Sequence, residues 1–273
     1  MITPVFKDLF FILNKKHLSL HKRIQLAFTF LLLKIRRRHY LHKNYQNAGE
    51  VINVSVVGYQ VSTDNIADLF ATFYEIFVTE EYKEVINGDD DVVFDVGANI
   101  GLATIYFDWL MPRVEIVGFE MDTDTYGLYQ KNLFSNKLDN VISHQVGIGE
   151  TNMKMDTYGS RRATTIVPDR ASKLPEKAEP TRKRTVEVRK LSEFLQAYGA
   201  VTLKLDIEGA EIGVIKELSN SSSFDKINRI VMEFHHPDES FGQVKDLLEA
   251  AGFVIKKFNV QANGYFMVNG YKN

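Results

Sequence analysis

The segment 92–120, VVFDVGANIGLATIYFDWLMPRVEIVGFE, constrains the fold more than any other part of the chain. A β-prone run leads into a glycine turn, DVGANIG, which is followed by a helix-like stretch at 102–110. A second apolar run ends on Glu120, nineteen positions after Gly101. Strand, glycine turn, helix, strand and acid is the order of a nucleotide-binding βαβ unit. The order predicts that backbone N–H groups of the turn approach a ligand and that the acid accepts hydrogen bonds from two ribose hydroxyls.

The alternation of strand and helix patterns continues beyond this unit. Further strands are expected at 141–146, 201–205 and 229–234, and further helices at 124–134, 191–198 and 240–251. This alternation predicts an α/β fold, in which a parallel sheet is covered by helices on both faces.

The segments on either side of this alternating region, near residues 50–77 and 252–268, have patterns of their own. Residues 50–61 alternate around Gly58 and predict a short hairpin, and Asp64 is expected to cap a helix at 65–77. The runs 252–259 and 265–268, joined across Asn263-Gly264, are typical of a terminal antiparallel hairpin.

Residues 150–183 interrupt this regular pattern. They are polar, rich in Lys, Arg and Thr, and contain three prolines. An irregular stretch of this length inside a compact domain is either disordered or functional. We expect a mobile flap on the substrate side, followed by an edge strand at 185–188.

The first 48 residues differ from the rest in charge. Residues 1–45 hold ten Lys or Arg and one Asp, so the remaining residues hold 33 − 10 = 23 basic and 35 − 1 = 34 acidic side chains. The longest apolar stretch, 24–35, is too short to cross a bilayer, which takes roughly 20 apolar residues. We expect a basic amphipathic helical segment at 1–48 that packs on a single domain at 49–273. Peripheral attachment to anionic lipid is the alternative, and nucleic-acid contact is disfavoured.

Cysteine is absent, which excludes disulfides and cysteine-ligated zinc. Nothing in the composition argues for an oxidising compartment, and no signal-peptide pattern is present. We therefore expect the chain in the cytoplasm, with membrane-peripheral attachment through residues 1–45 as the alternative.

A second acidic motif, LKLDIEGAE at 203–211, follows a later buried strand. Ligands of open parallel sheets bind outside the carboxyl ends of the strands, so Asp95, Glu120 and Asp206 are expected to converge there. A nicotinamide-dependent oxidoreductase competes with this interpretation, because the glycine turn alone is a weak signal. Asn99 at the place of a middle glycine and the acids at 206–211 favour methyl transfer over a dinucleotide fold.

Four motifs in this order resemble the FkbM family of S-adenosylmethionine-dependent O-methyltransferases: DVGANIG, FE at 119–120, LKLDIEGAE and RIVMEFH. The resemblance covers roughly residues 73–268. It implies a Rossmann-like, seven-stranded class I methyltransferase sheet whose last strand runs antiparallel. The family often has Glu-Pro at the end of the second strand, whereas here Met121 follows Glu120.

The resemblance also implies a set of cofactor contacts. Gly97, Asn99 and Gly101 would cradle the methionine portion of S-adenosyl-L-methionine, with Asp95 organising the turn. Glu120 would bind the ribose diol. The residues beside the adenine would be Met121, Gly147 and Ile148.

Methyl transfer to a hydroxyl needs help with the acceptor proton, typically worth about 10²–10⁴ in rate. Asp206 is the first candidate base, and His235, able to titrate near neutrality, is the second. Lys204 is expected to pair with Glu208 or to orient the acceptor, and Glu211 to favour a helix N-terminus only. Magnesium or manganese could bind among these side chains: Asp206, Glu208, Glu233 and His235.

The sequence thus predicts an O-methyltransferase whose acceptor is a sugar hydroxyl in a glycan or in a lipid- or nucleotide-linked precursor. RNA ribose methylation, a nicotinamide-dependent oxidoreductase and a binding-only scaffold are the alternatives. The prediction of a sugar acceptor rests on the family resemblance and on the charge of residues 1–45.

Overall fold

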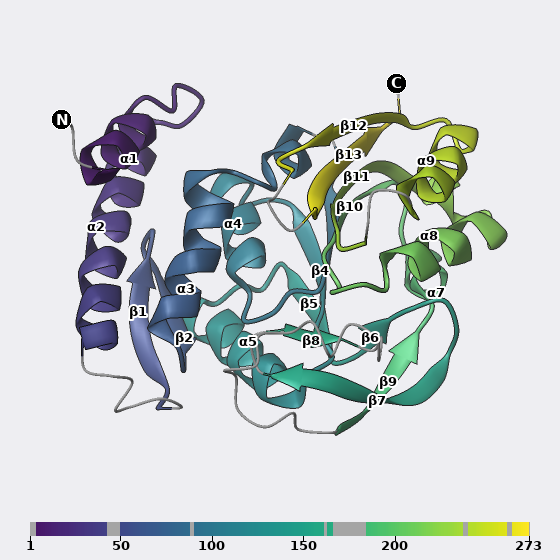
Figure 1. The fold of residues 1–273 in the computed structure, drawn as a ribbon, viewed down its shortest axis with the longest axis horizontal. Helices are drawn as coiled ribbons and strands as arrows, with labels where there is room; N and C mark the ends of the chain where they lie inside the picture. Colours follow the sequence, from purple (N-terminus) through teal and green to yellow (C-terminus); the bar gives the residue numbers. More distant parts are fainter. Residues whose placement is uncertain are drawn as a thin grey trace.

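The computed structural model describes residues 4–42, 50–87, 90–160, 163–165, 184–236, 240–260 and 264–272. Its centre is a seven-stranded sheet with the order β12-β13-β11-β10-β3-β4-β5 (Figure 1). The strands are β3 (Val92–Val96), β4 (Glu115–Phe119), β5 (Val141–His144), β10 (Val201–Leu205), β11 (Ile227–Phe234), β12 (Val254–Phe258) and β13 (Phe266–Tyr271). Five strands run parallel to one another: β3, β4, β5, β10 and β11. Strand β13 runs antiparallel to both of its neighbours, β11 and β12. The predicted fold class, including the terminal hairpin, is confirmed.

Helices cover both faces of this sheet because the strand side chains alternate. Val93 and Phe94, neighbours on β3, belong to two different hydrophobic clusters. One cluster includes residues of α4 (Leu102–Leu110) and α5 (Thr123–Asn136). The other includes residues of α7 (Leu191–Leu195), α8 (Glu211–Asn220) and α9 (Phe241–Ala250).

Two N-terminal helices, α1 (Pro4–Leu13) and α2 (Leu20–His42), lie along one edge of the molecule (Figure 1). We call this pair of helices the head. Leu26, Phe30 and Leu33 of α2 are fully buried in the same cluster as α4. The Lys22 ammonium also donates to the carbonyl of Trp109, at 2.6 Å. The inner face of the head is therefore part of the core of the body.

Between the head and the sheet lie β1 (Ile52–Val56), β2 (Tyr59–Thr63) and α3 (Ile66–Phe73). The predicted hairpin is present, with Gly58 at its turn. Asn65, and not Asp64, caps α3, because its side-chain oxygen accepts hydrogen bonds from the amides of Ala67 and Asp68. The predicted helix at 65–77 changes to a π-helix at Tyr74–Val78. Within the described residues, no helix is long and apolar enough to cross a membrane.

A smaller sheet, β6-β9-β7-β8, corrects two expectations. Its strands are β6 (Gly147–Ile148), β7 (Met153–Ser160), β8 (Ala163–Thr165) and β9 (Arg184–Arg189). The segment 185–188 was expected at an edge, but β9 pairs with β6 on one side and with β7 on the other. Part of the stretch expected to be irregular is thus β structure. The rest of that flap, 161–162 and 166–183, lies outside the described residues, as do residues 43–49 at the predicted boundary of the head.

Smaller differences concern the ends of elements. The helix expected at 191–198 ends at Leu195, and α8 extends into the predicted loop at 219–224. A 3₁₀ helix, Ser223–Lys226, then leads to β11, which begins at Ile227. These shifts are of the size expected for helix ends, which fray or change to 3₁₀ geometry.

Candidate active site

The glycine turn between β3 and α4 is held close to the end of β10. Gly97 has φ +82°, and a Cβ built on it would lie 1.7 Å from the carbonyl oxygen of Asp206. Asn99 and Gly101 also have positive φ, +52° and +92°. The amides of Gly97 and Ala98 both donate to the carbonyl of Phe119, at 3.0 and 2.8 Å. Only glycine fits at position 97, since a side chain there would collide with backbone.

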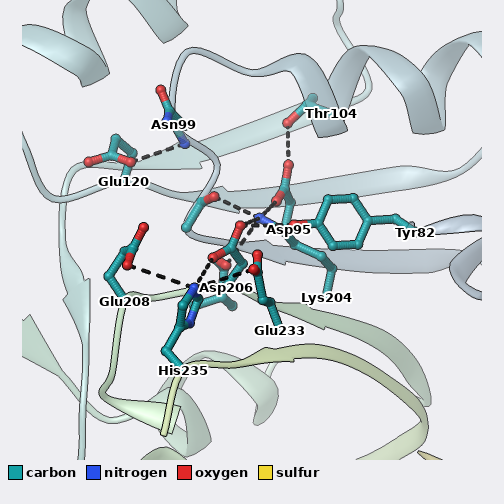
Figure 2. Close-up of polar contacts among 12 residues, drawn as sticks. Tyr82, Asp95, Asn99, Thr104, Glu120, Lys204, Asp206, Glu208, Glu233 and His235 are labelled. Carbon is teal, nitrogen blue, oxygen red and sulfur yellow. Dashed lines mark hydrogen bonds and ion pairs between the residues drawn. The ribbon is translucent and has the colours of Figure 1, made fainter. Parts of the chain in front are cut away.

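Glu120 lies beside this turn, at the end of β4. Its carboxylate accepts a hydrogen bond from the backbone amide of Asn99, at 3.0 Å (Figure 2). It accepts another from the backbone amide of Asp122, at 2.7 Å. A carboxylate has about four lone-pair positions, so each oxygen keeps acceptor capacity for a ligand hydroxyl. Burial raises the pKa of Glu120 to about 7, although the two amides act against this. The turn and the acid are therefore joined by a direct hydrogen bond.

Asp95 and Lys204 form a buried ion pair beneath the turn. Asp95 is 0% and Lys204 2% exposed, and Asp95 Oδ1 lies 3.1 Å from Lys204 Nζ. Lys204 also donates to the carbonyl of Gly97, at 2.7 Å, and Thr104 Oγ1 donates to Asp95 Oδ2, at 2.7 Å. Burial alone would lower the pKa of Lys204, but the carboxylates of Asp95 and Asp206 raise it. Lys204 thus pairs with Asp95 rather than with Glu208, and it fixes the turn.

Four ionisable side chains meet at the carboxyl ends of β10 and β11, and we call them the rim cluster: Asp206, Glu208, Glu233 and His235 (Figure 2). His235 Nε2 lies 3.8 Å from Asp206 Oδ1 and 3.7 Å from Glu208 Oε2. It lies 3.7 Å from Glu233 Oε1. The side chains of Asp206 and Glu208 are 25% and 30% exposed, against 4% for His235. A ligand from solvent therefore reaches the two acids more easily than the imidazole.

His235 is held by Glu211, a residue that the sequence analysis assigned only to a helix N-terminus. Glu211 is fully buried and accepts hydrogen bonds from His235 Nδ1 and from the amide of Gly209, both at 2.9 Å. Burial lowers the pKa of His235, but the hydrogen bond to Glu211 and the charges of Glu211, Asp206 and Glu208 together raise it to about 10. Titration of His235 near neutrality was therefore a wrong expectation. At neutral pH the imidazole is already protonated and is not available as a base.

The residues predicted to flank the adenine lie close together. A Cβ on Gly147 would lie 3.3 Å from the sulfur of Met121, which follows Glu120 directly. Ile148 is 3% exposed, and its side chain packs in the core with the residues of α7 and α8. Met121 and Gly147 therefore lie near Glu120, whereas the side chain of Ile148 points into the hydrophobic core.

Sequence reasoning missed the residues that approach the rim cluster from 74–87. Tyr82 is buried, and its hydroxyl donates to Asp206 Oδ2 at 2.8 Å. Burial, together with the charges of Glu75 and Asp206, raises the pKa of Glu81 to about 7. No motif marks this segment; the contact arises because the 3₁₀ helix Lys83–Asn87 packs on β10 and β11.

The rim cluster also meets a geometric requirement for a cation. One ligand atom each from Asp206, Glu233 and His235 lie within 4.8 Å of one another. Burial and the charge of Asp206 raise the pKa of Glu233 to about 8. The Glu233 carboxyl thus resists ionisation beside Asp206, and a positive charge placed between these two acids would favour its ionised form.

Comparisons with known proteins agree with this arrangement. The model of the methyltransferase FkbM domain matches residues 95–255, from the buried aspartate of the glycine turn into β12. Methyltransferase 1 of Beauveria bassiana is 28% identical over 198 residues, which are 66% of this chain and 79% of that protein. Methyltransferase sdnD of Sordaria araneosa is 28% identical over 213 residues, 68% of this chain and 82% of that protein.

A third relative has a more specific name. The 31-O-demethyl-FK506 methyltransferase FkbM of Streptomyces tacrolimicus is 23% identical over 194 residues, 60% of this chain and 73% of that protein. All three relatives carry a methyltransferase name, and the family model covers more than half of the chain. With the strand order and the glycine turn described above, this means that the chain is a methyltransferase and belongs to the FkbM methyltransferase family.

Proposed function

We propose that the chain transfers a methyl group from S-adenosyl-L-methionine to a hydroxyl oxygen. The residues present fit this donor, because Glu120 keeps acceptor capacity for two ribose hydroxyls beside the glycine turn. The acids of the rim cluster would lie near the donor's positive sulfur and complement its charge. The cofactor supplies the electrophilic methyl group, and the chain supplies alignment and removal of the acceptor proton.

Asp206 is the side chain proposed to take that proton. The methyl carbon would leave the donor sulfur, which becomes a neutral thioether, as it bonds to the acceptor oxygen. The hydroxyl proton would then pass to Asp206 Oδ1, because Tyr82 already donates to Oδ2. The protonated His235 stands 3.8 Å from Oδ1 and stabilises the carboxylate that is needed before the transfer. His235 is therefore proposed as a positioning residue, held in place by Glu211.

We extend the proposal to a sugar hydroxyl of a glycan, or of its lipid- or nucleotide-linked precursor, as the acceptor. Support for transfer to oxygen comes from the name of the Streptomyces tacrolimicus relative, a 31-O-demethyl-FK506 methyltransferase. Family membership removes the nicotinamide-dependent oxidoreductase from the alternatives. RNA ribose remains a competing acceptor, and the cytoplasm remains the proposed compartment.

A divalent cation is not part of the proposed mechanism. The three side chains that could share one include His235, and the high pKa of its imidazole means that a cation would have to displace a proton. We propose that the rim cluster works with the sulfonium of the donor and the proton of the acceptor, without magnesium or manganese.

The proposal depends most on one observation, the contact of the glycine turn with the carbonyl of Asp206. This contact brings the predicted donor site and the predicted base into one space. The test is incubation of the full chain with methyl-tritiated S-adenosyl-L-methionine and extracts of glycans, lipid-linked sugars and RNA in parallel.

Label in a sugar ether that is absent with the Asp206→Asn variant would support the proposal. Label found only in RNA ribose would make RNA the acceptor, while the reaction would still be methyl transfer to a hydroxyl oxygen. Label transferred equally well by Asp206→Asn would rule out the proposed base.

A further inference from the structure

The head has an outer face that is apolar although it faces solvent. On α2 the exposed side chains Leu20, Ile24, Phe28, Leu31 and Ile35 recur every three or four residues. At 100° per residue these five positions span an arc of about 80°. The buried side chains of α2 occupy the opposite side of the same helix. A single amphipathic helix has one apolar face, whereas α2 has two, of which the body covers one.

The first helix, which packs on α2, has exposed apolar side chains of its own. Phe6, Phe10 and Leu13 of α1 are all exposed and also follow a spacing of three or four residues. Phe10 is 72% exposed and Phe28 66%, values that an isolated surface residue can have. A concentration of such residues on two adjoining helices is different, because large exposed apolar patches mark interaction surfaces.

The charge of the head indicates what covers this face. Lys7, Lys16 and Arg38 are exposed on or beside the two helices, and the whole segment 1–45 has ten basic residues and one acid. A second copy of this chain would bring two strongly basic segments into contact and leave their charges uncompensated. A surface of anionic lipid would instead accept both the apolar side chains and the basic ones.

We propose that the outer face of α1 and α2 docks on an anionic lipid surface, with Phe10, Phe28 and Ile35 in the acyl boundary and the basic residues at the headgroups. The head lies in the plane of the surface and does not cross it. The inner face of α2 stays packed on the body, so docking needs no unfolding. This inference goes beyond the proposed reaction and does not depend on its acceptor.

The test is flotation of the full chain with two kinds of vesicle, pure phosphatidylcholine and phosphatidylcholine with one third phosphatidylglycerol. We expect binding to the anionic vesicles that falls steeply with salt. Phe10→Ser and Phe28→Ser should each weaken it about tenfold, the size expected from exposing one buried aromatic side chain. Arg38→Gln and Lys16→Gln should each weaken it about fivefold.

Phe134→Ser is the matched control, because Phe134 is 87% exposed but lies on α5. This variant should bind vesicles like the unaltered chain, and all variants should keep their methyl-transfer rate on an acceptor free in solution. Equal loss in Phe134→Ser and Phe28→Ser would overturn the proposal. Absence of vesicle binding would also overturn the proposal. If light scattering then shows a dimer that Phe28→Ser dissociates, the outer face binds a second copy of the chain instead of lipid.

Discussion

The head and the rim cluster use charged residues in opposite ways. Around the rim, Asp95, Lys204 and Glu211 are buried and held by hydrogen bonds, so their positions are fixed before any ligand arrives. On the head, basic residues such as Lys16 and Arg38 are exposed beside apolar side chains. Buried, hydrogen-bonded charges can hold reacting groups in one fixed geometry. Exposed charges beside apolar side chains can instead bind a broad partner surface that has no fixed shape.

The strongest test of the rim is removal of the proposed base. Asp206→Asn should lower kcat by about 10²–10⁴, the usual contribution of a general base. Single-turnover assays with saturating donor measure this directly. Glu249→Gln, which alters an exposed acid on α9, is the control. A kcat within twofold of that of the unaltered chain would mean that a group other than Asp206 takes the proton.

The two faces of the head should differ sharply in their effect on stability. Leu26→Ala should lower the free energy of unfolding by about 2–5 kcal/mol, because it leaves a cavity in the core cluster. Ile24→Ala, on the outer face, should change it by no more than about 0.5 kcal/mol. Urea unfolding of both variants measures the contrast. Equal effects would mean that the head does not share the core of the body.

Loss of the charge at Glu120 should weaken donor binding. If Glu120 holds the ribose as proposed, Glu120→Gln would replace two charge-assisted hydrogen bonds with neutral ones, and we expect the Kd for S-adenosyl-L-methionine to rise about 10- to 100-fold. Calorimetry measures this Kd, and Gln130→Glu, an exposed change elsewhere, serves as the control. An unchanged Kd would place the ribose elsewhere.

Donor affinity should also depend on pH through the same carboxyl group. The pKa of Glu120 is about 7 without donor, and only the ionised carboxylate accepts both ribose hydroxyls. The Kd should therefore be constant above pH 8 and rise as pH falls through 7, by up to about tenfold per unit. Titrations at pH 6, 7 and 8 give the slope, and Glu120→Gln should remove it. A slope of the opposite sign would contradict the assignment.

The smallest effect is expected from metal removal. Treatment with EDTA should change the methyl-transfer rate by no more than about twofold, because the proposed mechanism uses the charges of the rim cluster without a divalent ion. Assays before and after chelation, with magnesium or manganese added back, measure this. Restoration of a lost activity by either ion would instead make Asp206, Glu233 and His235 its ligands.

Much of the site was predictable because the carboxyl ends of parallel strands meet at one edge. The turn of Gly97, the acid Glu120 and the residue Asp206 each follow a strand in the sequence, so the topology alone brings them together. The contact of Tyr82 with Asp206 was not predictable, since the segment around Tyr82 has neither a motif nor a strand pattern. It reaches the rim through packing that involves residues more than 100 positions apart.

The state of His235 could not be read from the sequence for a different reason. Its pKa depends on burial, which lowers it, and on Glu211, Asp206 and Glu208, which together raise it more. Sequence spacing does not say which of several acids will pair with a given imidazole. The same limit applies to Lys204, for which Glu208 was the expected partner and Asp95 is the observed one.

The absent side chain at Gly97 has a mechanical consequence. Because a Cβ at this position would lie 1.7 Å from the carbonyl oxygen of Asp206, any larger residue at position 97 would force the glycine turn and the end of β10 apart. Such a substitution would disturb the proposed donor site and the proposed base together, because they lie on the two sides of this contact.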